Sequence, residues 1–159
     1  MLENRCCSIG EDEKVVVIEY LYLDLNTCER CVKTEKVLES VVDELRHAFK
    51  IAGYSLEYHK VLIETAEMAT AYRFLSSPTI RVNGTDICNA VNRNSCGDIA
   101  GIQIDRRAFS YNGKTYETPP AEMIAKEIIK WSLIPKLPSL LLDEYVLPDA
   151  LKSFFDGKQ

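Results

Sequence analysis

The chain has 159 residues, a net charge of −5 and a hydrophobic fraction of 47%, which is the composition of one globular domain able to bury a core. Its acidic balance and lack of a basic stretch exclude a general electrostatic affinity for nucleic acid or anionic membranes. No apolar run approaches the roughly 20 residues of a membrane-spanning helix, and the N-terminus is polar rather than signal-like, so we expect a cytoplasmic protein without membrane or nucleic-acid partners.

The first half of the chain predicts a βαβ unit. Residues 15–23 form a β-branched and aromatic run that is typical of a buried strand. From residue 31 onward, apolar side chains recur at helical spacing with charged residues opposite them, and Gly53 is a suitable end for that helix. Residues 54–62 partly alternate and predict a second strand. The two strands should therefore be parallel, with a right-handed crossover.

The middle of the chain predicts a short helix, a hairpin and an insertion. Residues 64–75 place apolar side chains on one helical face, and a strand beginning at Pro78 runs into Asn83-Gly84, a strong hairpin signal. Residues 85–105 show no sustained period, so we predict an inserted loop there.

The last third predicts a second hairpin and a final helix. Residues 106–117 turn at Asn112-Gly113, after which Thr118 can cap a helix whose first turn holds Pro119. The predicted buried face of this helix consists of Met123, Ile124, Ile128 and Trp131.

These patterns divide the chain into three parts. We predict a flexible tail over residues 1–14, an α/β domain over 15–131 and an extension over 132–159. The extension is rich in apolar side chains between residues 139 and 155, so we expect either a packed extra helix or an association arm, for example of a homodimer.

Six cysteines carry most of the chemical information. Six in 159 residues are too few for a disulfide-stapled scaffold, and in a reducing compartment such cysteines indicate catalysis or metal binding. The six are Cys6, Cys7, Cys28, Cys31, Cys88 and Cys96.

The pair Cys28 and Cys31 follows a buried strand and opens a helix. A thiolate there faces unpaired backbone N–H groups and the positive end of the helix dipole, which favour its charged form. Cys28 is nearer the helix tip and should be the exposed, attacking thiol, with Cys31 as the resolving thiol. Arg30 is close enough to assist the charge, and Asp24 is a candidate for proton relay or for capping the loop.

The segment Ser77-Pro78-Thr79-Ile80 at the head of a strand completes the pattern. With the CxxC pair and the order of elements, it resembles the thioredoxin-like superfamily over residues 15–131. That resemblance implies a thioredoxin-like fold in which Pro78 is cis and lies against the cysteine pair. It also implies that Ser77, Pro78 and Thr79 contact an extended substrate.

The chain is also similar to an uncharacterised thioredoxin-like family, a domain of unknown function. This family carries an early CxxC, a cysteine-bearing insertion and a YxGKxYxxPP segment, which here comprises Tyr111, Gly113, Lys114, Tyr116, Pro119 and Pro120. Family members usually have more cysteines in the insertion than the two found here. The dipeptide between Cys28 and Cys31, Glu-Arg, also departs from the Gly-Pro of thioredoxin.

Two functions follow from this reading. The first is a thiol–disulfide oxidoreductase acting on a protein or small-molecule disulfide, without a cofactor. The alternative is a soft-metal or metalloid binding protein that uses Cys28 and Cys31, with Cys6 and Cys7 as further candidate ligands. Cys88 and Cys96 form a candidate second thiol pair, and a four-cysteine zinc site would need both to reach the first pair.

Overall fold

The computed structural model describes residues 14–23, 28–87, 90–92, 98–99, 102–103, 106–135 and 144–157. The β-branched run near the N-terminus forms strand β1 (Lys14–Tyr22) inside a four-stranded sheet of order β2-β1-β3-β4. Strand β2 (Tyr54–Leu62) is parallel to β1, while β3 (Thr79–Val82) is antiparallel to β1 and β4 (Thr85–Asp86) is antiparallel to β3. This is an α/β fold built on a βαβ unit, consistent with a thioredoxin-like fold, as predicted.

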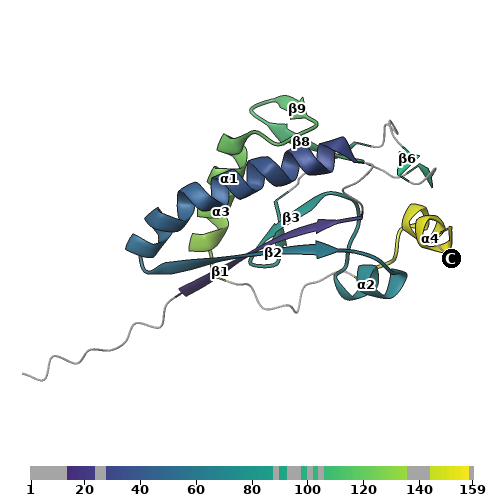
Figure 1. Cartoon of the computed structure of the whole chain (residues 1–159), viewed down its shortest axis with the longest axis horizontal. Helices are drawn as coiled ribbons and strands as arrows, with labels where there is room; N and C mark the ends of the chain where they lie inside the picture. The colour runs from purple at the N-terminus through teal and green to yellow at the C-terminus, as the bar shows by residue number, and fades with distance from the viewer. Residues whose placement is uncertain are drawn as a thin grey trace, which may run out of the picture.

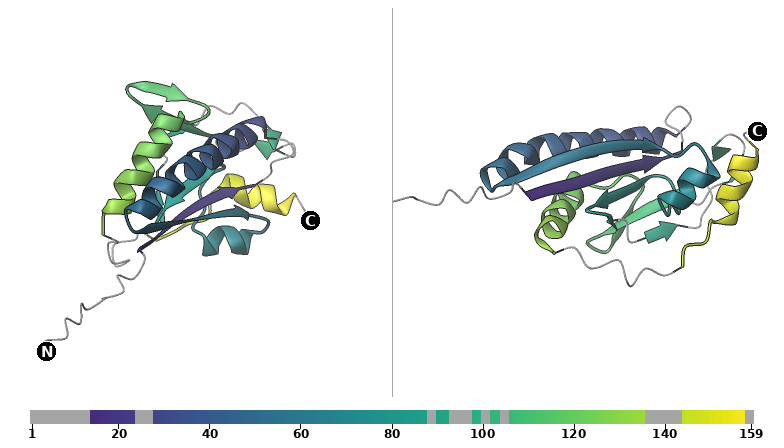
Figure 2. Two further views of the ribbon diagram at one scale, coloured as in Figure 1. Left: turned by 60° about the vertical axis from the view of Figure 1, so that its left-hand side comes forward. Right: turned by 90° about the horizontal axis from the view of Figure 1, so that it is seen from below.

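Two long helices lie side by side along the sheet (Figures 1 and 2). Helix α1 (Glu29–Ile51) connects β1 to β2, and helix α3 (Ala121–Leu133) packs beside it. Their apolar faces and the sheet bury one cluster, here called the sheet core. The sheet core consists of Val16, Ile18, Tyr20, Leu38, Val41, Val42, Phe49, Leu56, Ile80, Val82, Ile87, Phe109, Met123, Ile124 and Ile128.

Two short helices, α2 (Ala66–Ala71) and α4 (Asp149–Asp156), contact each other at the end of the sheet where α1 begins (Figure 1). They contribute to a second buried cluster, here called the cysteine cluster. The cysteine cluster consists of Leu21, Leu23, Cys28, Cys31, Ile63, Ala69, Phe74, Leu151, Phe154 and Phe155. The apolar face of α4 is thus buried within its own chain, and the prediction of a homodimer through the extension stays a prediction.

Both predicted Asn-Gly hairpins are confirmed. Asn83 and Gly84 have φ of 49° and 82°, and Asn112 and Gly113 have φ of 50° and 74°, the left-handed pair that a tight hairpin turn requires. The second turn joins β8 (Arg106–Tyr111) to β9 (Lys114–Tyr116).

The segment predicted as a loop contains short strands. Besides β4, it holds β5 (Ala90–Asn92), which pairs with β8, and a small hairpin of β6 (Asp98–Ile99) and β7 (Ile102–Gln103). Strands of two or three residues are too short to show a period in the sequence.

Two helix boundaries differ from the prediction. Helix α2 covers 66–71 rather than 64–75, and Thr65 caps it by accepting a hydrogen bond from Met68 N at 3.1 Å. The N-cap of α3 is Pro120, without a side-chain cap bond, so the prediction that Thr118 caps this helix was wrong. Pro120 provides an extended N-cap backbone two residues after Thr118, and Ile124 N donates to its carbonyl.

Candidate functional site

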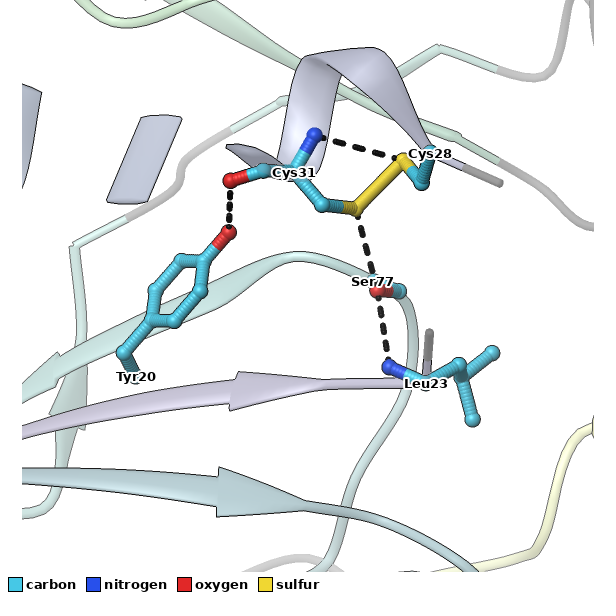
Figure 3. Close-up of a disulfide and its surroundings, with 5 residues drawn as sticks. All are labelled: Tyr20, Leu23, Cys28, Cys31 and Ser77. Atoms are coloured by element: carbon cyan, nitrogen blue, oxygen red, sulfur yellow. Dashed lines mark hydrogen bonds between the residues drawn. A yellow bond between two sulfur atoms is a disulfide. The ribbon is translucent and has the colours of Figure 1, made fainter. Parts of the chain in front are cut away.

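Cys28 and Cys31 lie at disulfide distance at the beginning of α1 (Figure 3). Their Cα atoms are 5.2 Å apart, within the range of protein disulfides. Cys28 is the N-cap residue, with extended backbone, and its Sγ accepts a hydrogen bond from Cys31 N at 3.3 Å. The sulfur of Cys28 therefore occupies the place where a helix N-terminus offers an unpaired N–H group.

Both sulfurs are buried. The exposed fraction is 4% for Cys28 and 0% for Cys31, so Cys28 is the more accessible of the two but is not the exposed thiol that the sequence predicted. The reason is the cysteine cluster, in which apolar side chains from β1, α2 and α4 gather around the pair. Only a small part of Cys28 is therefore exposed to an incoming disulfide.

Polar contacts hold the pair in place from two other segments (Figure 3). Tyr20, on β1, donates its hydroxyl to Cys31 O at 2.6 Å. Ser77, in the loop before β3, has its Oγ 3.7 Å from Cys31 Sγ and 3.2 Å from Leu23 N, which donates to it.

The loop that carries Ser77 also has the predicted backbone geometry. The peptide bond between Ser77 and Pro78 is cis. Ser77, Pro78 and Thr79 are all buried, and their contact with a substrate stays a prediction. Thr79 Oγ1 donates to Ser76 O at 2.6 Å and closes the turn.

Arg107 is a residue of this region that the sequence did not predict. Its side chain is only 3% exposed; Nε donates to Ser76 Oγ, and the guanidinium also pairs with Asp86. A charged side chain this buried has to be paired. The sequence held one signal, because Arg107 shares a strand face with the buried Phe109, two residues away.

The charged residues between the cysteines turn toward other partners. Arg30 forms an ion pair with Glu117, and its proposed assistance to the Cys28 charge stays a prediction. Glu29 pairs with Lys33 at 2.7 Å on the exposed face of α1, and this hydrogen bond lowers the pKa of Glu29.

The remaining predicted site residues lie outside the described part of the chain. These are Cys6, Cys7, Asp24, Cys88 and Cys96. Within the described ranges, no group of three or more His, Cys, Asp or Glu is arranged to hold a metal ion. None of the helices in those ranges is both long and apolar enough to cross a membrane.

The model of one protein family, the domain of unknown function DUF2703, matches residues 16–128. The chain belongs to the DUF2703 family. The matched part of this DUF2703 protein contains both cysteines, the Ser77-Pro78 loop and Arg107, whereas α4 lies beyond it. No curated protein and no solved structure matches the chain.

Proposed function

We propose that this DUF2703 protein is a thiol–disulfide oxidoreductase whose Cys28–Cys31 pair exchanges with the disulfide of a protein or small molecule. One observation carries the proposal: two cysteines at disulfide distance on the first turn of a helix, with a cis-proline loop in contact with the second sulfur.

The helix terminus favours Cys28 as the attacking group. In the reduced protein its thiolate keeps the N–H of Cys31 as a donor and faces the positive end of the α1 dipole. Both stabilise the thiolate, which is the nucleophile in disulfide exchange.

The reaction then has two steps. The Cys28 thiolate attacks one sulfur of the substrate disulfide, breaks that bond and releases the first substrate thiolate, which takes a proton from water. The Cys31 thiolate next attacks Cys28 Sγ in the mixed disulfide and releases the second substrate thiolate. The substrate disulfide gains two electrons and the protein dithiol loses two, so turnover needs an external dithiol reductant.

Reduction of insulin with dithiothreitol tests this function. We expect the wild-type protein to accelerate insulin reduction, Cys28→Ser to lose that acceleration, and Cys31→Ser to accumulate a mixed disulfide at Cys28. Thr34→Val is a matched control, because Thr34 is fully buried one turn further along α1 and belongs to neither step. The mechanism is wrong if Cys28→Ser retains the wild-type rate.

The alternative of soft-metal binding has less support. The described residues contribute two thiols to such a site and no third ligand group beside them. Tight, stoichiometric binding of arsenite or zinc by the reduced protein, without insulin reduction, would favour this alternative over exchange.

A further inference from the structure

The hydroxyl group of Ser77 has an orientation that its neighbours determine. Its oxygen accepts a hydrogen bond from Leu23 N at 3.2 Å and lies 3.7 Å from Cys31 Sγ (Figure 3). A disulfide sulfur carries no hydrogen, so Cys31 cannot be the donor in the second contact. The single proton of Ser77 is therefore the one directed at Cys31 Sγ.

From this geometry we infer that Ser77 is a positioning residue for the second step of exchange: its hydroxyl donates a hydrogen bond to the Cys31 thiolate that closes the disulfide. This inference rests on the proposed function and adds a residue to it. It assigns a role to the Ser77 side chain, whereas the family resemblance implies only a contact between the loop and substrate.

The Ser77 hydroxyl is important because Cys31 is buried. Cys31 is 0% exposed and Ser77 is 3% exposed, so bulk water does not solvate a thiolate at Cys31. The N–H group of Cys31 donates to Cys28 Sγ, and Tyr20 donates to the carbonyl of Cys31 rather than to its sulfur. Among the described contacts, Ser77 is thus the polar partner of Cys31 Sγ, in surroundings where a hydrogen bond to a charged atom counts for more than in water.

Two opposing effects determine how much the loss of the Ser77 hydroxyl slows the second step of exchange. Ser77 transfers no proton; it raises the fraction of Cys31 present as thiolate and, with it, the rate of attack on Cys28 Sγ. Losing the bond should move the pH midpoint of this step up by about one unit. At neutral pH this shift makes the thiolate fraction of Cys31 about tenfold smaller. The more basic thiolate is about threefold more nucleophilic, so the rate of closure should fall about threefold.

The test follows release of a mixed disulfide between Cys28 and glutathione over a range of pH. Reduced full-length protein is mixed with oxidised glutathione and quenched with acid. Its free thiols are then alkylated with N-ethylmaleimide, so that exchange cannot resume at the pH of the digestion. Trypsin cuts after Arg30, between the two cysteines, so a disulfide that joins the two fragments reports closure of the Cys28–Cys31 bond and ignores the other thiols. We expect Ser77→Ala to raise the pH midpoint of closure and to slow it at pH 7, and Ser77→Thr to restore both.

Ser76→Ala is the matched control. Ser76 is as buried as Ser77, but the contacts of the two hydroxyls differ. The Ser76 hydroxyl accepts a hydrogen bond from Arg107, whereas the Ser77 hydroxyl contacts Cys31 Sγ. It should lower stability without moving the midpoint. If Ser77→Ala does not fold, Ser77→Gly removes the same hydroxyl.

The outcomes separate the two proposals. If wild-type protein forms neither the mixed disulfide nor the Cys28–Cys31 disulfide, the proposed function fails. If it forms and closes with the same midpoint in wild type and Ser77→Ala, exchange stands and the role of Ser77 is refuted. An equal shift in Ser76→Ala would also refute it, because the effect would then come from disturbing the loop.

Discussion

The hydroxyl of Tyr58, on β2, is buried without a hydrogen-bond partner among the described residues. Burial, followed by the nearby carboxylates of Glu39 and Glu35, raises the pKa of this phenol. The pKa of Lys60, on the same strand, is also raised, chiefly by its hydrogen bond to Glu35. Both groups therefore hold their protons more tightly in the folded chain than in the unfolded chain.

The sign of the resulting pH dependence follows from linkage. The folded chain keeps its full stability below about pH 10, where both groups are protonated in the unfolded chain as well, and loses stability as the pH rises further. We predict that Tyr58→Phe is neutral or stabilises the protein by up to about 1 kcal/mol at pH 7, because it removes an unsatisfied polar atom. The variant should also lose less stability above about pH 10, because only the loss due to Lys60 remains.

Urea unfolding of wild type and Tyr58→Phe at pH 7 and above pH 10 measures both effects. A clear loss of stability in the variant at pH 7 would show that the hydroxyl has a partner, such as ordered water, and would contradict the prediction.

Helix α4 belongs to the cluster that surrounds the disulfide. Leu151, Phe154 and Phe155 share the cysteine cluster with Cys28 and Cys31. The segment before α4 is fixed as well, since the Tyr145 hydroxyl donates to Phe74 O at 2.6 Å and Arg73 lies over the Tyr145 ring.

Loosening α4 should therefore expose the sulfurs. A charge in place of Phe154 costs more than the roughly 3 kcal/mol of a Phe→Ala change in a core, so Phe154→Asp should detach the helix. We predict that dithiothreitol then reduces the Cys28–Cys31 bond at least about tenfold faster, as measured by alkylation and mass spectrometry.

Ser153→Asp is the control, because it places the same charge on the exposed side of the same helix. Equal reduction rates in the two variants would show that α4 does not limit access, provided that the circular dichroism of α1 and the sheet is retained.

The end of helix α2 shows why element boundaries were harder to predict than elements. Arg73 adopts a left-handed φ of 50°, Arg73 N donates to Thr70 O, and Phe74 N donates to Ala69 O. This is a Schellman motif, which usually has glycine at the left-handed position. With arginine there, the sequence shows no stop, and burial of Phe74 decides where the helix ends.

Across the whole molecule, the features that were predicted correctly are those set by residues close together in the chain. The CxxC spacing, the strand before it, the Ser77-Pro78 loop and both hairpin turns are short-range patterns, and the structure contains each of them. The contacts that complete the site are long-range: Arg107 reaches Ser76 across 31 positions. No periodicity encodes such contacts, and the cluster that buries Cys28 likewise includes residues as distant in the chain as Leu151 and Phe154.

The separation between the sheet core and the cysteine cluster has an optical consequence. The single tryptophan of the chain, Trp131 on α3, packs against the sheet core, and its Nε1 donates to Glu127 at 2.9 Å. Its emission should shift to the red when urea unfolds the protein, yet stay constant when the disulfide is reduced under native conditions. A change in emission on reduction alone would mean that the redox state of the cysteine pair is transmitted to α3, which α1 contacts directly.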